Sequence, residues 1–144
     1  MFRRSMLRAV LLGLAVAALV IPGAALAAKP KPGGSYGDCA GDRCKVSEIK
    51  VSANGSKVVV FQAYTKCNPV PIITFPAMRI TPAGTFSFSG RVKDVIKNSI
   101  KVEISGKFVS ASVVRGTMRF STASCNSKTL SYRALLGKGV GITG

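Results

Sequence analysis

From Cys44 onward, apolar and polar residues alternate with a period of two rather than 3.6. This alternation places one set of side chains on each face of an extended strand and is typical of a sheet with one buried face. The clearest runs lie at residues 85–89, 100–105, 117–121 and 130–135. Gly, Asn, Ser and Pro separate the runs, and nothing after the N-terminal region predicts an amphipathic helix. We therefore expect an all-β fold of about six or seven strands, an antiparallel β-sandwich with a barrel as the alternative.

The dipeptide Asn54-Gly55 stands between two alternating runs and predicts a hairpin. Asn and Gly tolerate the positive φ angles of a two-residue type I′ turn. Counting outward from that turn gives the pairs Ala53–Ser56, Val51–Val58 and Ile49–Val60. Further along, three prolines within residues 67–76 argue against a central strand, because proline cannot donate a backbone hydrogen bond. We expect that stretch to form an edge or a loop.

Residues 1–27 have the pattern of a secretory signal peptide. Three arginines within the first eight residues precede an apolar run over residues 9–21, and Pro22-Gly23 follows it. Small residues at positions 25 and 27 suit a signal peptidase, so we expect cleavage after Ala27. A retained anchor is the alternative, because residues 9–28 carry no charge and about 20 apolar residues span a bilayer. The helix-breaking Pro-Gly pair and the small-residue site favour removal, and hence secretion.

Removal of the leader would leave 117 residues, enough for one hydrophobic core. We divide them into a flexible Lys/Pro/Gly linker at 28–37, a single β domain at 38–136 and a glycine-rich tail at 137–144. The whole chain has a net charge of +16, and the leader removes three arginines and no acid, so the mature chain would carry +13. In an exported protein this surplus indicates anionic partners outside the cell: wall polymers, acidic polysaccharide or lipid headgroups.

All four cysteines, Cys39, Cys44, Cys67 and Cys125, follow the expected cleavage site. An even number of cysteines in an exported chain predicts disulfides, and four cysteines allow three pairings. Of these we favour Cys39–Cys44, which closes a tight loop, together with Cys67–Cys125, which joins distant strands. A metal site is disfavoured because the chain has no histidine and the cysteine spacings do not repeat. A redox pair is disfavoured because four residues separate Cys39 from Cys44, where a redox motif has two.

A series of short segments marks the C-terminal half: Gly84-Thr85-Phe86-Ser87, Ser105-Gly106-Lys107-Phe108, Gly116-Thr117-Met118-Arg119-Phe120, Cys125 and Tyr132-Arg133-Ala134. This succession, over residues 84–134, resembles small exported bacterial β-sandwich-like proteins of unassigned function. The resemblance implies a β fold and export. It implies no functional residues.

The chain offers few groups for catalysis. Without histidine, Ser-His and Cys-His pairs are excluded, and bridged cysteines supply no nucleophile. An enzyme would have to use carboxylates from the set Asp38, Asp42, Glu48, Asp94 and Glu103. We expect structural roles for all five, in turns for the aspartates and in cross-strand charge pairs for the glutamates. The sequence therefore predicts neither catalysis nor a bound metal or cofactor.

Many of the cations fall on the polar phase of the expected strands. Five of them define a candidate site for an anionic polymer: Arg91, Lys93, Lys101, Arg119 and Arg133. If their strands are neighbours, these side chains share an outward face and form a positive stripe. The alternative is a solvated face that keeps the protein soluble. Specific nucleic-acid binding is not expected, because the chain is exported and lacks tryptophan and an obvious platform for stacking bases.

The sequence thus predicts a secreted, non-catalytic binding or structural module that associates electrostatically with anionic cell-wall or surface polymers. One alternative is a secreted protease inhibitor that presents the proline-stiffened loop at residues 68–79. A second is the carboxylate enzyme considered above. The oligomeric state stays open, and no transmembrane segment is expected once the leader is removed.

Overall fold

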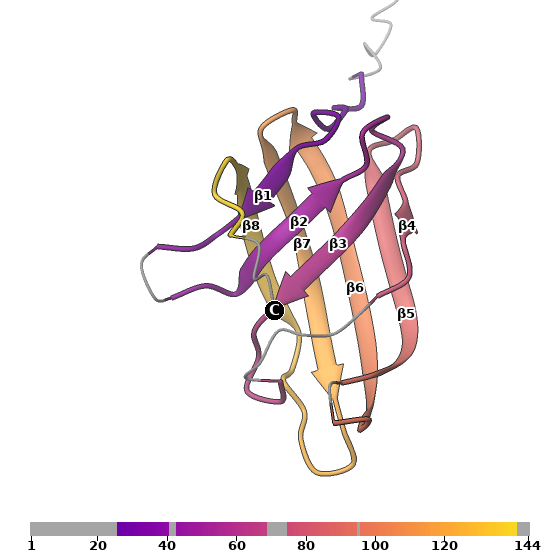
Figure 1. Ribbon diagram of the computed structural model, residues 1–144, viewed down its shortest axis with the longest axis vertical. Coiled ribbons are helices and arrows are strands. Elements are labelled where there is room, and N and C mark those ends of the chain that lie inside the picture. Colours follow the sequence, from indigo (N-terminus) through magenta and orange to yellow (C-terminus); the bar gives the residue numbers. More distant parts are fainter. Residues whose placement is uncertain (1–25, 41–42, 69–74, 95, 141–144) are drawn as a thin grey trace, which may run out of the picture.

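The computed structural model describes residues 26–40, 43–68, 75–94 and 96–140, and this part of the chain is built from strands without a helix. All strand pairs are antiparallel, and the strands form one continuous sheet in the order β4-β3-β2-β1-β8-β7-β6-β5 (Figure 1). The eight strands are β1 (Ser35–Gly37), β2 (Val46–Val51), β3 (Lys57–Ala63), β4 (Met78–Arg79), β5 (Thr85–Lys93), β6 (Ser99–Ser110), β7 (Val113–Ser121) and β8 (Leu130–Leu136).

The sheet curls into a nearly closed barrel. Its two edge strands, β4 and β5, lie against each other, although no ladder pairing joins the described residues of the two. The all-β antiparallel prediction is confirmed, and the barrel alternative rather than the two-layer sandwich describes the layout. The strand number exceeds the expected six or seven because β1 and β4 are too short to show an alternating pattern.

Alternation along the strands sorts the side chains as expected. In β6, buried residues alternate with exposed or half-buried ones from Ser99 to Val109. The interior is filled mainly by aliphatic and aromatic side chains, and the largest fully buried ones are Tyr36, Phe61, Phe108 and Phe120. The rings of Tyr36 in β1 and Phe108 in β6 meet edge to face with centroids 5.3 Å apart, which joins these two strands inside the barrel.

Two glycines provide room for a buried tyrosine in the wall formed by β6 and β7. Gly106 and Gly116 are direct cross-strand partners, and Gly116 also pairs with Tyr132 of β8. A Cβ atom at Gly106 or Gly116 would lie 2.6 or 2.4 Å from the Tyr132 hydroxyl oxygen, so the ring occupies space that side chains would fill. The Tyr132 hydroxyl donates a hydrogen bond of 2.8 Å to the carbonyl oxygen of Ser105. Burial raises the pKa of Tyr132 above its ordinary value.

The two favoured disulfides are both present, and the described residues contain no free cysteine. Cys39–Cys44 closes the turn before β2, where the Asp38 carboxylate accepts hydrogen bonds from the backbone amides of Lys45 and Val46 at 2.8 and 2.9 Å. Cys67–Cys125 ties the segment after β3 to the connection between β7 and β8. The long bridge therefore links opposite parts of the sheet.

The β2–β3 hairpin differs from the predicted one. Val51 does face Val58, but Ile49 faces Phe61 instead of Val60, because an irregularity between Lys50 and Val51 shifts the register. The turn is also not type I′: of its two expected central residues only Gly55 has a positive φ, of 74°. Instead the Gly55 amide donates to the Ser52 carbonyl, and the Asn54 side chain accepts from Ser56.

The prediction of a flexible linker over residues 28–37 is wrong at its C-terminal end, where Ser35–Gly37 form β1 between β2 and β8. Tyr36 is fully buried, and its hydroxyl accepts from the Lys31 amide at 2.9 Å and donates to the Ala111 carbonyl at 2.6 Å. Residues 1–25 of the expected leader lie outside the described residues. In the part that is described, no apolar helix of membrane-spanning length occurs.

Candidate anion-binding site

A row of five cations crosses the outer surface of the sheet from β3 to β8. Sheet register places Lys57 of β3 opposite Arg79 of β4, and Lys107 of β6 opposite Arg115 of β7. Arg115 in turn faces Arg133 of β8. Thr85 of β5 bridges the row, because it is the partner of Lys107 and lines a groove together with Arg79. We call Lys57, Arg79, Lys107, Arg115 and Arg133 the cationic belt.

The belt cations are available to an external ligand. All five residues are exposed. None of them forms a salt bridge or a side-chain hydrogen bond with another residue in the described ranges, where the single ion pair is Lys101–Glu103 at 3.6 Å. Paired strands lie about 4.8 Å apart, so the backbone positions of the direct partners Lys57–Arg79, Lys107–Arg115 and Arg115–Arg133 lie within one Debye length, about 8 Å, at physiological salt. Their fields therefore add.

Two open grooves meet on the belt at Arg79 and Thr81, which line both. The first has a volume of ≈ 710 Å³ and runs between the N-terminal segment, the β2–β3 hairpin turn and the β4–β5 turn. The second, of ≈ 610 Å³, lies over β5, β6 and β7 and includes Lys107 and Arg115. No Asp or Glu is among the described residues that line either groove. Each groove is therefore basic without internal neutralisation.

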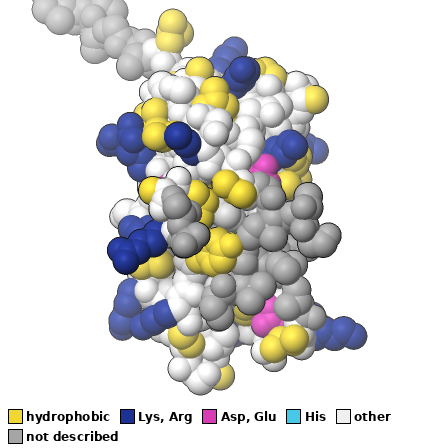
Figure 2. Space-filling view, turned by 60° about the vertical axis from the view of Figure 1, so that its left-hand side comes forward, with side chains coloured by type: hydrophobic (Ala, Val, Ile, Leu, Met, Phe, Trp, Pro, Cys, Tyr) yellow, Lys and Arg dark blue, Asp and Glu magenta, His cyan; other side chains and the backbone are white. Residues whose placement is uncertain are grey.

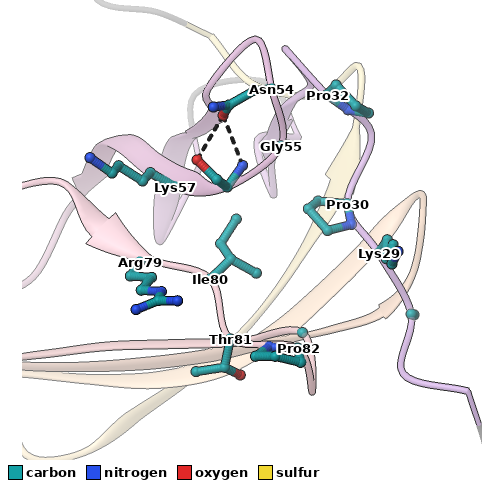
Figure 3. Close-up of a pocket in the computed structure, with 13 residues that line it drawn as sticks. Lys29, Pro30, Pro32, Asn54, Gly55, Lys57, Arg79, Ile80, Thr81 and Pro82 are labelled. Carbon is teal, nitrogen blue, oxygen red and sulfur yellow. Dashed lines mark hydrogen bonds between the residues drawn. The ribbon is translucent and has the colours of Figure 1, made fainter.

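The first groove combines cations with apolar walls (Figure 3). Figure 3 shows Lys57 and Arg79 on one side and Lys29 on the other, with Ile80 and Pro30 between them. The Asn54 side chain points into its own hairpin turn, where its oxygen accepts hydrogen bonds from the amide and hydroxyl of Ser56 at 3.1 and 2.7 Å. Those bonds hold the turn that forms one rim. The groove can accept an anionic group flanked by apolar atoms.

The five cations selected from the sequence do not form one stripe. Only Arg133 belongs to the belt. Arg91 pairs with Lys101, and Lys93 faces Ser99, at the far end of β5 and β6. Lys101 is six residues from Lys107 along β6, or about 20 Å. Arg119 of β7 lies between the position of Lys101 and that of Lys107 along the sheet. It faces Glu103, whose carboxylate reduces the positive potential there.

Two central members of the belt, Lys107 and Arg115, were missed in the sequence. Both continue alternating patterns that were visible, Lys107 after Lys101 and Glu103, and Arg115 before Thr117 and Arg119. That signal shows that their side chains face outward. It does not show that they are cross-strand partners, because register depends on the length of the β6–β7 turn.

The acidic residues that the structure describes are engaged in local interactions. Asp94 accepts hydrogen bonds from the amides of Ile96 and Asn98 at 3.0 and 2.8 Å, as a turn residue does. Glu48 is largely buried in β2 and accepts a hydrogen bond of 2.9 Å from the Ser35 hydroxyl. Asp38 caps the short disulfide loop, and its neighbours Cys39 and Cys44 offer no thiolate to a metal because they are bonded to each other. Asp42 lies outside the described residues.

The proline-rich loop at 68–79 is only partly within the described chain, since residues 69–74 lie outside it. Its two ends are tied to the barrel. Asn68 is buried and donates to the Ala63 carbonyl at 3.0 Å, while Met78 is buried and Arg79 pairs with Lys57. The end of the loop therefore holds Arg79 in the sheet, as part of the belt.

The face in Figure 2 shows cationic side chains from its top to its bottom and few acidic ones. Positive potential therefore extends well beyond the belt, which differs from its surroundings in the run of cations over three successive strands and in the two grooves. Comparison with protein-family models, with curated proteins and with solved structures finds no match for this chain, so its function has to be inferred from this surface.

Proposed function

We propose that the protein is a secreted, non-catalytic module that binds anionic cell-wall or surface polymers through the cationic belt. The observation that carries this proposal is a row of five exposed cations that have no ion-pair partner within the described parts of the chain, alongside two grooves with no carboxylate among their described lining residues. The signal-peptide pattern and the two disulfides support an oxidising location outside the cytoplasm.

The arrangement of the belt is costly for an unliganded protein. Like charges directly opposite each other on a sheet destabilise it, and Lys107, Arg115 and Arg133 occupy three successive strands in this way. A polyanion that lies across the strands relieves this repulsion at every cation. A linear polymer with repeated charges is thus a better ligand for the belt than a single small anion, and its binding depends strongly on salt.

The proposal is tested with two double variants of equal charge. Lys107→Gln with Arg115→Gln removes the centre of the belt, whereas Arg91→Gln with Lys93→Gln removes two exposed cations of β5 about 20 Å away. Binding to purified bacterial cell-wall fragments is measured by co-sedimentation at 0.15 M and 1 M salt. We expect the wild type to bind at 0.15 M and to be released at 1 M.

The belt variant should lose about 1–2 kcal/mol of binding free energy, or roughly tenfold in affinity, because two favourable charge contacts disappear. The control pair lies more than two Debye lengths from the belt, so its loss should stay below about threefold. Absence of wild-type binding at both salt concentrations, or retention that salt does not change, would contradict electrostatic binding. Equal losses in the two variants would show that net charge matters and that the belt is not the site.

A further inference from the structure

A third groove lies beside the belt and differs from the other two in chemistry. It has a volume of ≈ 320 Å³ and covers the outer surface of β5, β6 and β7. Its polar side chains are hydroxyls together with one carboxylate and one guanidinium: Ser87, Ser89, Glu103, Ser105, Thr117, Arg119 and Thr129. We call it the hydroxyl groove.

Three of the seven polar side chains of the hydroxyl groove make no contact within the described chain that competes with a ligand. Ser105 and Thr117 share a hydrogen bond of 3.0 Å, and Glu103 pairs with Lys101 at 3.6 Å. The side chains of Ser87, Ser89 and Arg119 have no partner among the residues that the structure describes. The groove therefore offers hydroxyls that both donate and accept, a carboxylate that only accepts and a guanidinium that only donates.

This mixture suits the hydroxyl groups of a sugar better than a phosphate. A sugar hydroxyl donates to a carboxylate and accepts from a guanidinium, so it can use Glu103 and Arg119 together. A phosphate has only acceptor oxygens when fully ionised, and Glu103 repels it. The groove is thus selective against the simplest polyanions, although the belt attracts them.

The hydroxyl groove and the belt form one continuous surface. Ser87 and Ser105 line both this groove and the basic groove that contains Lys107 and Arg115. Ser105 is two residues from Lys107 along β6, which is about 7 Å. A single polymer can therefore place a sugar unit in the hydroxyl groove and an acidic group on the belt.

We propose that the ligand is an acidic polysaccharide, whose sugar hydroxyls bind Glu103 and Arg119 in the hydroxyl groove while its acidic groups bind the belt. This inference rests on the function proposed above and specifies the class of polymer. It assigns Glu103 a role that net charge alone does not predict, since removal of an acid normally strengthens the binding of a polyanion.

The test is Glu103→Gln, measured by titration against two probes at 0.15 M salt: a polyuronic acid and inorganic polyphosphate with the same number of charges. Glu103 is half-buried at an outward strand position and contributes nothing to the core, so the variant retains the fold. Loss of a hydrogen bond to a charged acceptor should weaken polyuronate binding roughly tenfold. Polyphosphate binding should strengthen, because a repulsive charge has been removed. The two probes thus respond with opposite signs.

A second variant, Ser87→Ala with Ser89→Ala, keeps the net charge and removes two free hydroxyls. It should weaken polyuronate binding and leave polyphosphate binding unchanged. If Glu103→Gln strengthens or does not alter polyuronate binding, the saccharide role of the groove is wrong, while the belt still binds polyanions. If neither probe binds the wild-type protein at all, the proposed function itself fails.

Discussion

The two disulfides should differ in their contribution to stability, and the structure allows the difference to be calculated. The comparison is between Cys67→Ala with Cys125→Ala and Cys39→Ala with Cys44→Ala. The first bridge spans a sequence separation of 58 residues and the second a separation of 5. A crosslink stabilises mainly by restricting the unfolded chain, and this effect grows with the logarithm of the loop length.

With that dependence, the long bridge contributes about 4 kcal/mol to the free energy of unfolding and the short bridge about 2 kcal/mol. Cys67 also packs against the core, so its replacement removes apolar contacts as well. Cys39 lies outside the core cluster, at the short loop before β2. The long-bridge variant should therefore be less stable than the short-bridge variant by at least about 2 kcal/mol.

Urea denaturation followed by far-UV circular dichroism measures this difference. A gap of 2 kcal/mol corresponds to midpoints about 1 M urea apart for a domain of this size. The reasoning is refuted if the two variants have the same midpoint, or if the short-bridge variant unfolds first. A long-bridge variant that is already unfolded without urea, beside a folded short-bridge variant, would support the calculated order.

Three further predictions concern the barrel interior. Gly116→Ala should lower the free energy of unfolding by about 1–3 kcal/mol in urea, because its Cβ would lie 2.0 Å from the Ser105 carbonyl oxygen; a midpoint equal to wild type would show that the strand moves without cost. Tyr132→Phe should cost about 1 kcal/mol at pH 7 through the lost hydrogen bond. Because burial raises the pKa of Tyr132, the neutral hydroxyl contributes to the free energy of unfolding of the wild type below about pH 10, and this contribution is lost as the pH rises through the folded-state pKa. Tyr132→Phe has no ionisable group at this position and should therefore resist alkaline unfolding better than the wild type. Parallel plots of stability against pH for the two proteins would contradict this expectation. Phe108→Ala should cost about 3–5 kcal/mol and lower the melting temperature measured by calorimetry, because Phe108 is fully buried against Tyr36 and Phe86; an unchanged melting temperature would contradict the packing.

The long strands could be read from the sequence because their alternation is one-sided over many residues. In β6 the inward residues Ile100, Val102 and Ile104 are buried, and the outward Lys101 and Lys107 are exposed. The disulfide pairing could also be predicted, because the lack of histidine and the cysteine spacing disfavoured a metal site or a redox pair, and a short loop favours a local bridge. Periodicity and chemistry of this kind are properties of single segments.

Features that depend on contacts between residues far apart in the sequence could not be predicted from the sequence. Strand β1 follows four alternating Lys and Pro residues and two glycines, which is the composition of a linker. Strand β1 is held in place by the Tyr36 hydroxyl, which donates a hydrogen bond to the carbonyl of Ala111, 75 residues away. The belt was missed for the same reason, since the neighbourhood of Lys107, Arg115 and Arg133 exists only once three strands are in register.

The position of β1 between β2 and β8 also determines when the protein can fold. A chain that emerges from a ribosome or a membrane pore presents its N-terminal end first, so Tyr36 becomes available long before Leu130–Leu136. Without that last strand, β1 can pair on one side only, and the other strands can pair only as two separate sets, β4-β3-β2-β1 and β7-β6-β5, with open edges. Pairing between the first and last strands gives the topology many non-local contacts and therefore slow folding. Closure of the barrel is thus a late event that requires nearly the whole polypeptide.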